Sequence, residues 1–209
     1  MTKIKICGLK KVQDIMAVNK ALPDYIGFVF ADSPRQIDAQ KAQELKACLH
    51  PAVKTVGVFV NEKRENIVQL CHAAVIDLVQ LHGDEDETYI KYLKSCVSQK
   101  IIKAVRVKDK AEIKEALTLP CDYFLFDTYH KDLYGGTGKT FTWSLLPEIE
   151  KPYFLAGGIN AANVLPAIDA CSPYCVDVSS GVEVNGEKDP EKILKLVALV
   201  REKTTPPLG

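Results

Sequence analysis

The segment 3–30, KIKICGLKKVQDIMAVNKALPDYIGFVF, contains the structural unit from which the rest of the fold is predicted. Lys3–Cys7 and Tyr25–Phe30 are short runs of β-branched and aromatic residues, which are typical of strands. Val12–Ala21, between them, has the apolar spacing of a helix. A helix between two such strands indicates a βαβ unit, in which the two strands are parallel.

The same alternation continues along the chain. The further predicted strands are Thr55–Val60, Ile76–His82, Ile101–Val107, Tyr123–Asp127, Tyr153–Ala156 and Cys175–Ser179. The further predicted helices are Ala39–Leu49, Glu62–Cys71, Glu87–Cys96, Ala111–Leu117, Ser144–Ile149, Ala161–Ile168 and Pro190–Arg201. Eight strands in 209 residues predict an α/β fold, a (β/α)8 TIM barrel that forms a single domain over residues 1–209. An open doubly wound sheet is the alternative, but its first turn usually carries a glycine-rich fingerprint that Cys7-Gly8-Leu9-Lys10 lacks.

The charge balance argues against several classes of partner. Lys and Arg together number 27, as do Asp and Glu, so the formal net charge is zero and no broad field attracts nucleic acid or an anionic membrane. The sequence has no apolar signal region and no run of about 18 apolar residues. We therefore expect a cytoplasmic protein that binds neither nucleic acid nor membrane, and the scattered apolar residues predict a monomer.

The cysteines do not indicate a metal site. Seven are spread along the chain, and we expect most of them to be reduced core residues. Cys171 and Cys175 are four residues apart, but no second Cys or His pair completes a zinc set. The sequence therefore predicts no metal.

The predicted strand ends carry the polar residues that suggest chemistry. In a barrel of this kind the active site lies at the C-terminal ends of the strands. The residues found there are Cys7-Gly8, Ala31–Arg35, Gln80–Gly83, Asp127, Ala156–Gly158 and Asp177–Gly181. Gln80, His82 and Asp177 are candidates for binding a substrate, although a lone histidine at a strand end can also serve only to satisfy a loop carbonyl.

The ends of the last two strands predict a phosphate site. Gly157 and Gly158 let the backbone approach a ligand closely, because no Cβ intervenes. Ser179 and Ser180 add hydroxyls and further N–H groups, and in this fold the loops after strands seven and eight often bind phosphate. We therefore expect a phosphorylated small molecule as the ligand.

A glycine-rich run, Gly135–Thr140, resembles a nucleotide-binding loop but fails its pattern, because Leu133 stands where glycine is required. We expect this run to be a lid over the barrel mouth, and we count Gly136 among the phosphate-binding candidates.

Strand alternation predicts one further contact. If Cys7 points into the barrel, Lys5 does too, while Ile4 and Ile6 face the helices. The first and eighth strands are neighbours in a closed barrel, and Asp177 shares a face with Ser179. We therefore expect Lys5 and Asp177 to pair beneath the active site.

Taken in order, these segments resemble those of the phosphoribosylanthranilate isomerase family over nearly the full chain. The matching segments are Lys5–Gly8, Ser33–Arg35, Gln80–Gly83, Gly135–Phe141, Leu155–Gly158 and Asp177–Glu183. The resemblance implies a (β/α)8 barrel and an Amadori rearrangement of N-(5-phosphoribosyl)anthranilate in tryptophan biosynthesis, without a cofactor. It also implies Cys7 as general base, Asp127 as general acid and Arg35 near the anthranilate part of the substrate.

Two positions depart from the family pattern. Gln36 stands where an aromatic residue is common, which would alter the pocket wall, and Cys175 stands where a small residue is usual. A general base works best with a lowered pKa, and we expect a helix N-terminus and Lys5 to lower the pKa of Cys7.

Three other functions remain as alternatives. The related sugar isomerase of histidine biosynthesis would carry aspartate at position 7 and two phosphate sites. Pentose-phosphate epimerase would need metal-binding His and Asp residues at several strand ends, where only His82 is available. A non-catalytic phosphate-binding protein is the third, and the presence of both Cys7 and Asp127 argues against it.

Overall fold

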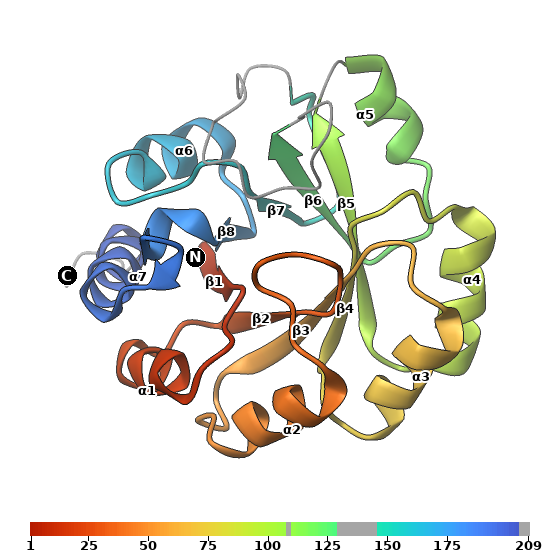
Figure 1. Cartoon of the computed structure of the whole chain (residues 1–209). Helices are drawn as coiled ribbons and strands as arrows, with labels where there is room; N and C mark the ends of the chain where they lie inside the picture. The colour runs from red at the N-terminus through yellow and green to blue at the C-terminus, as the bar shows by residue number, and fades with distance from the viewer. Residues whose placement is uncertain (108–109, 129–145, 205–209) are drawn as a thin grey trace.

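The eight predicted strands form a closed barrel in the computed structural model, which describes residues 1–107, 110–128 and 146–204. Each strand pairs in parallel with the next one along the chain, and β8 pairs with β1 to close the ring (Figure 1). The strands are β1 (Lys3–Cys7), β2 (Tyr25–Val29), β3 (Lys54–Phe59), β4 (Leu78–Leu81), β5 (Lys100–Val107), β6 (Tyr123–Thr128), β7 (Tyr153–Leu155) and β8 (Cys175–Val178). The predicted (β/α)8 barrel is therefore confirmed.

Helices surround the barrel, as Figure 1 shows. They are α1 (Val12–Ala21), α2 (Ala39–Ala47), α3 (Arg64–His72), α4 (Glu87–Cys96), α5 (Lys110–Ala116), α6 (Val164–Cys171) and α7 (Pro190–Thr204). The last helix, α7, packs against both α1 and α6 and so joins the two ends of the helical ring. Among the described residues, no helix is long and apolar enough to cross a membrane.

Several predicted helix boundaries differ from the structure, and one predicted helix is irregular in its described part. The described part of Ser144–Ile149, from residue 146, is irregular, and it contains Pro147, which has no N–H for a helical hydrogen bond. The helix expected from Ala161 begins at Val164, after a turn. The helix expected from Glu62 begins at Arg64, after Lys63 at its N-cap, and the side chain of Asn61 accepts a hydrogen bond from the backbone N–H of Asp84.

The barrel interior and the layer between strands and helices have different compositions. Ile4 and Ile6 of β1 lie in the apolar layer under the helices, as the alternation predicted. Inside the barrel, near the N-terminal ends of the strands, a second apolar cluster includes Tyr25, Leu125 and Phe154. The C-terminal ends of the same strands carry the polar residues, and these define the site.

A short extension follows β8 before the last helix. The 3-10 helix η2 (Ser180–Val182) leads into a two-stranded antiparallel hairpin of β9 (Glu183–Val184) and β10 (Glu187–Lys188). Asp189 then caps α7 by accepting a hydrogen bond from the backbone N–H of Lys192 at 2.8 Å, which confirms the predicted start of this helix at Pro190.

Candidate active site

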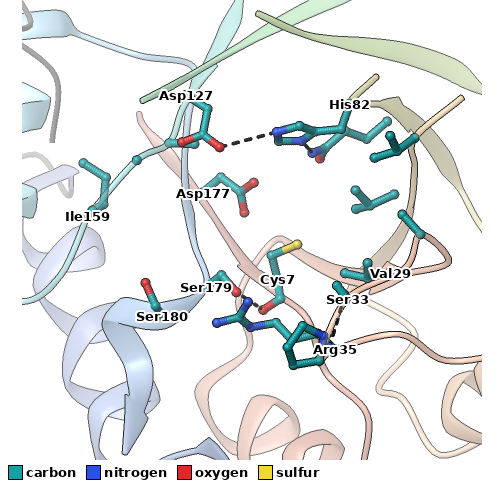
Figure 2. Close-up of a pocket in the computed structure, with 18 of the residues that line it drawn as sticks. Cys7, Val29, Ser33, Arg35, His82, Asp127, Ile159, Asp177, Ser179 and Ser180 are labelled. Atoms are coloured by element: carbon teal, nitrogen blue, oxygen red, sulfur yellow. Dashed lines mark hydrogen bonds and ion pairs between the residues drawn. The ribbon is translucent and has the colours of Figure 1, made fainter. Parts of the chain in front are cut away.

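A pocket of about 550 Å³ opens at the C-terminal ends of the strands. Figure 2 shows side chains from the ends of different strands, such as Cys7, His82 and Asp127, pointing into this pocket. The predicted site residues that line it are Cys7, Arg35, Gln80, His82, Asp127, Gly157, Gly158, Asp177, Ser179 and Ser180. Gly136 and the rest of the glycine-rich run lie outside the described residues. The fold thus brings together, in one cavity, residues from six strands or the loops that follow them.

Cys7 ends β1 and is buried beside β2. Its neighbour across the sheet is Gly27, where a Cβ atom would come within 2.5 Å of the Cys7 sulfur, so only glycine leaves room for the thiol. Burial raises the pKa of the Cys7 thiol, and the charge of Lys5 opposes that rise without overcoming it. The expectation of a lowered pKa is therefore wrong for the ligand-free pocket, because the cost of burying a thiolate exceeds the attraction of the ammonium.

Lys5 lies beneath the pocket and is fully buried. Its ammonium donates hydrogen bonds to Asp177 Oδ2 at 2.8 Å and to Gln80 Oε1 at 2.7 Å. The predicted pairing with Asp177 is therefore confirmed. Burial is the largest single influence and would lower the pKa of Lys5, but the charge and hydrogen bond of Asp177 together with the charge of Cys7 outweigh it, so the pKa of Lys5 is raised and the ammonium form is favoured. Among the described residues, Oδ1 of Asp177 has no hydrogen-bond partner.

Asp127 and His82 face each other across the pocket from β6 and the end of β4 (Figure 2). Nε2 of His82 lies 3.4 Å from Oδ2 of Asp127, and both side chains are largely buried. On its other side the imidazole ring is held by Gln80, whose Nε2 lies 2.9 Å from His82 Nδ1. In the described ranges the His82 side chain therefore contacts two side chains and bonds no loop carbonyl.

The loop after β7 and the loop after β8 form the opposite wall. Gly157 and Gly158 have φ angles of 84° and 68°, a conformation that favours glycine. The carbonyl of Gly158 accepts hydrogen bonds from the side-chain amides of Asn160 and Asn163, which fixes the loop. Ser179 donates a hydrogen bond to the backbone carbonyl of Cys7 at 3.1 Å and so joins this wall to β1.

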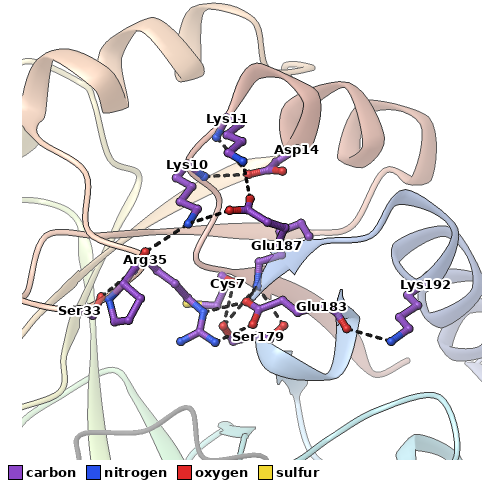
Figure 3. A network of polar contacts seen from close by, with 12 residues as sticks. Cys7, Lys10, Lys11, Asp14, Ser33, Arg35, Ser179, Glu183, Glu187 and Lys192 are labelled. Carbon is purple, nitrogen blue, oxygen red and sulfur yellow. Dashed lines mark hydrogen bonds and ion pairs between the residues drawn. The ribbon is translucent and has the colours of Figure 1, made fainter. Parts of the chain in front are cut away.

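Arg35 enters the pocket from the loop after β2 and is held by the β9–β10 hairpin (Figure 3). Its Nε and Nη2 donate to the two carboxylate oxygens of Glu183, each at 2.7 Å. Lys188 donates to the same carboxylate at 2.6 Å and to the carbonyl of Ser179 at 2.9 Å. Burial would raise the pKa of Glu183, but its bonds to Arg35 and Lys188 lower it to about 2.

The Arg35–Glu183–Lys188 cluster was not predicted from the sequence. Arg35 and Glu183 are 148 residues apart, and no local pattern joins them. Arg35 and Glu183 each lie in a segment that resembles the isomerase family. A search of those segments for residues of opposite charge could have suggested the pair.

Apolar residues form the wall next to Arg35. They are Val29, Pro34, Val58 and Val60. Gln36 does not line this pocket; its amide donates to the carbonyl of Phe30 on the outer side of the loop. The expectation that Gln36 alters the pocket wall is therefore wrong. In the described part of the chain, no group of three or more His, Cys, Asp or Glu side chains is arranged to hold a metal ion.

Comparisons with known proteins give one consistent result. A family model described as N-(5'phosphoribosyl)anthranilate (PRA) isomerase matches residues 4–198. The N-(5'-phosphoribosyl)anthranilate isomerase of Endomicrobium trichonymphae is 53% identical over 201 residues, which cover 96% of this chain and 99% of that protein.

Solved structures agree with the sequence comparisons. The phosphoribosyl anthranilate isomerase of Thermotoga maritima superposes with a TM-score of 0.88 at 37% identity and covers 97% of this chain and 100% of that one. A phosphoribosyl anthranilate isomerase in complex with reduced 1-(o-carboxyphenylamino)-1-deoxyribulose 5-phosphate has a TM-score of 0.84 at 33% identity, with the same coverage.

Proposed function

The chain belongs to the N-(5'-phosphoribosyl)anthranilate isomerase family, the isomerases of tryptophan biosynthesis, and on that premise we propose that Cys7 is its general base and Asp127 its general acid. The reaction converts N-(5'-phosphoribosyl)anthranilate into 1-(2-carboxyphenylamino)-1-deoxyribulose 5-phosphate by an Amadori rearrangement. The main support for this proposal is that the Cys7 thiol on β1 and the Asp127 carboxyl on β6 line the same pocket.

The first step opens the sugar ring. The Asp127 carboxyl gives its proton to the ring oxygen as the bond from that oxygen to C1 breaks. The lone pair of the anthranilate nitrogen forms a double bond to C1 at the same time. This step gives an open-chain imine cation and leaves Asp127 as a carboxylate.

The second step moves a proton from C2. The Cys7 thiolate takes this proton, and the electron pair of the C–H bond forms a double bond between C1 and C2 while the imine pair returns to nitrogen. The enolamine then gains a proton at C1 and loses the proton of its C2 hydroxyl, which gives the ketone. Lys5 supports this step because its charge favours the thiolate.

The rest of the pocket fits the two ends of the substrate. Backbone N–H groups at Gly157, Gly158, Ser179 and Ser180 suit a phosphate. At the other end, the apolar wall suits an aromatic ring, and Arg35 suits its carboxylate. Arg35 uses Nε and Nη2 for Glu183, so Nη1 is not part of that pair. Gln80, His82 and Asp177 then face the sugar between these ends.

The test follows the fluorescence of the anthranilate substrate, which should fall on addition of the protein without metal or nucleotide. Cys7→Ala and Asp127→Asn should each lower kcat by about 10²-fold or more, because each removes a proton-transfer group. Cys71→Ala is the matched control, since Cys71 is also a buried thiol but lies on the buried face of α3 and does not line the pocket. Near-normal turnover by either site variant would contradict the role given to that residue.

A monomer remains our prediction for the assembly, and static light scattering on the purified protein tests it.

A further inference from the structure

A chain of polar contacts runs across the pocket through three strands. The Lys5 ammonium lies 2.7 Å from Gln80 Oε1, and Gln80 Nε2 lies 2.9 Å from His82 Nδ1. His82 Nε2 lies 3.4 Å from Asp127 Oδ2. These contacts thus connect the buried Lys5 ammonium on β1, through Gln80 and His82, to Asp127 on β6, the proposed acid.

The first of these contacts decides which way the Gln80 amide points. An ammonium group can only donate hydrogen bonds, so the oxygen of Gln80 has to face Lys5. Turning the amide over would place its NH2 group against the ammonium and leave a buried donor without an acceptor, which is unfavourable. The Gln80 NH2 group therefore faces His82.

The orientation of Gln80 in turn decides the tautomer of His82. An amide NH2 group only donates, so Nδ1 of His82 has to accept. A neutral imidazole carries one N–H, and that proton is then on Nε2. This N–H is buried, has no hydrogen-bond partner among the described residues and points toward Asp127. The other ionisable groups that line the pocket, in the part of the chain that the structure describes, are Cys7, Asp32, Arg35 and Asp177.

We propose that Lys5 and Gln80 fix His82 in the neutral Nε2–H form, and that His82 thereby positions Asp127 as an acid. This inference rests on the proposed function. Nε2–H, which lies 3.4 Å from Oδ2 of Asp127, closes onto that oxygen when the substrate binds, so the acidic proton is carried on the other carboxyl oxygen. After that proton has left, the same N–H stabilises the carboxylate that forms. A proton on both nitrogens would instead give an imidazolium that holds Asp127 as a carboxylate and removes the acid.

The tautomer can be measured without any turnover. In the ligand-free protein labelled with 15N-histidine, the His82 Nε2 resonance should show a directly bonded proton and Nδ1 should not, at pH 7 to 8. The chain has four histidines, and the resonances that disappear in His82→Gln identify His82. A proton on Nδ1 in the wild-type protein would overturn the inference, whatever the enzyme does.

Gln80→Glu tests the consequence for catalysis with almost no change in shape. A glutamate at position 80 still accepts from Lys5 but also accepts from His82, so the His82 proton moves to Nδ1 and the imidazolium is favoured. Because hydrogen bonds to charged groups contribute about 1.5–3 kcal/mol, kcat should fall about tenfold to a hundredfold with little change in KM. Gln40→Glu adds the same charge on exposed α2 and should leave kcat unchanged.

A pair of His82 variants separates positioning from packing. His82→Gln can still present an N–H to Asp127 and should keep kcat within about threefold, whereas His82→Leu should lose about tenfold or more. Equal activity of these two variants, or a Gln80→Glu enzyme as fast as wild type, would overturn the inference. If Asp127→Asn keeps normal turnover, the proposed acid fails and the inference fails with it. If Asp127→Asn is inactive but His82→Leu is not impaired, only the inference fails.

Discussion

The lower and upper halves of the barrel interior are built from the same strands but contain opposite kinds of side chain. The lower half is filled with aromatic rings: Phe154 packs against Tyr25 and Tyr123 with ring centroids 5.7 Å apart in each pair. The upper half contains Lys5 and Asp177 as a buried ion pair. The apolar layer thus lies below and the polar residues above, where β2 and β3 add the apolar side chains of Val29 and Val58.

The two halves also differ in how completely their polar atoms are paired. In the lower half the hydroxyls of Tyr25 and Tyr174 lie 2.9 Å apart, and the Lys3 ammonium lies 5.1 Å from the centroid of the Tyr174 ring. In the upper half, among the described residues, His82 Nε2 and Asp177 Oδ1 are buried without a hydrogen-bond partner. The lower half is complete without a ligand, whereas the upper half is arranged for one. We therefore expect mutations below to affect stability and mutations above to affect activity.

Lys5→Met gives the largest expected effect, because Lys5 contributes both to the stability of the fold and to the activity. It leaves Asp177 as a buried charge without its partner, which typically costs about 3–5 kcal/mol in the free energy of unfolding. It also removes the cation that favours the Cys7 thiolate, so kcat should fall as well. Urea denaturation and the fluorescence assay measure the two effects. A variant as stable as wild type would show that the ion pair contributes nothing to the upper half.

Phe154→Leu tests the lower half alone. It replaces a fully buried ring that contacts Tyr25, Tyr123 and Tyr174. We expect a loss of about 1–2 kcal/mol in the free energy of unfolding, from lost ring contacts and imperfect packing. The activity per folded molecule should stay the same. A selective fall in kcat without a fall in stability would break the division between the two halves.

Glu183→Gln removes a carboxylate that stabilises the fold at neutral pH, so the variant should be less stable than wild type there, and the difference between the two should shrink in acid. The pKa of Glu183 is lowered to about 2 in the folded protein from an ordinary value of 4.5. A carboxylate with a lowered pKa contributes stability above its unfolded pKa, and this contribution is lost as the pH falls toward the folded pKa. Wild type should therefore lose an increment of stability between about pH 4.5 and 2 that Glu183→Gln does not lose. Equal changes in the free energy of unfolding of the two proteins over this pH range would contradict this expectation.

The sequence predicted those features that depend on strand alternation. It placed Lys5 opposite Asp177 because a closed barrel makes the first and last strands neighbours, and the observed register pairs these two residues. It could not predict the Arg35–Glu183 pair, which is made by a hairpin outside the barrel pattern. It also gave the wrong direction for the pKa of Cys7, because a residue's depth is set by neighbours such as Gly27 on another strand.

The most direct test of the central claim is a crystal structure of this protein with the reduced product, 1-(o-carboxyphenylamino)-1-deoxyribulose 5-phosphate. Our account predicts the Cys7 sulfur within about 3.5 Å of C2 of the sugar chain. It also predicts the Asp127 carboxyl on the hydroxyl that derives from the ring oxygen. A complex in which C2 is nearer to another side chain, or in which the phosphate or the anthranilate ring occupies the space between Cys7 and Asp127, would contradict it.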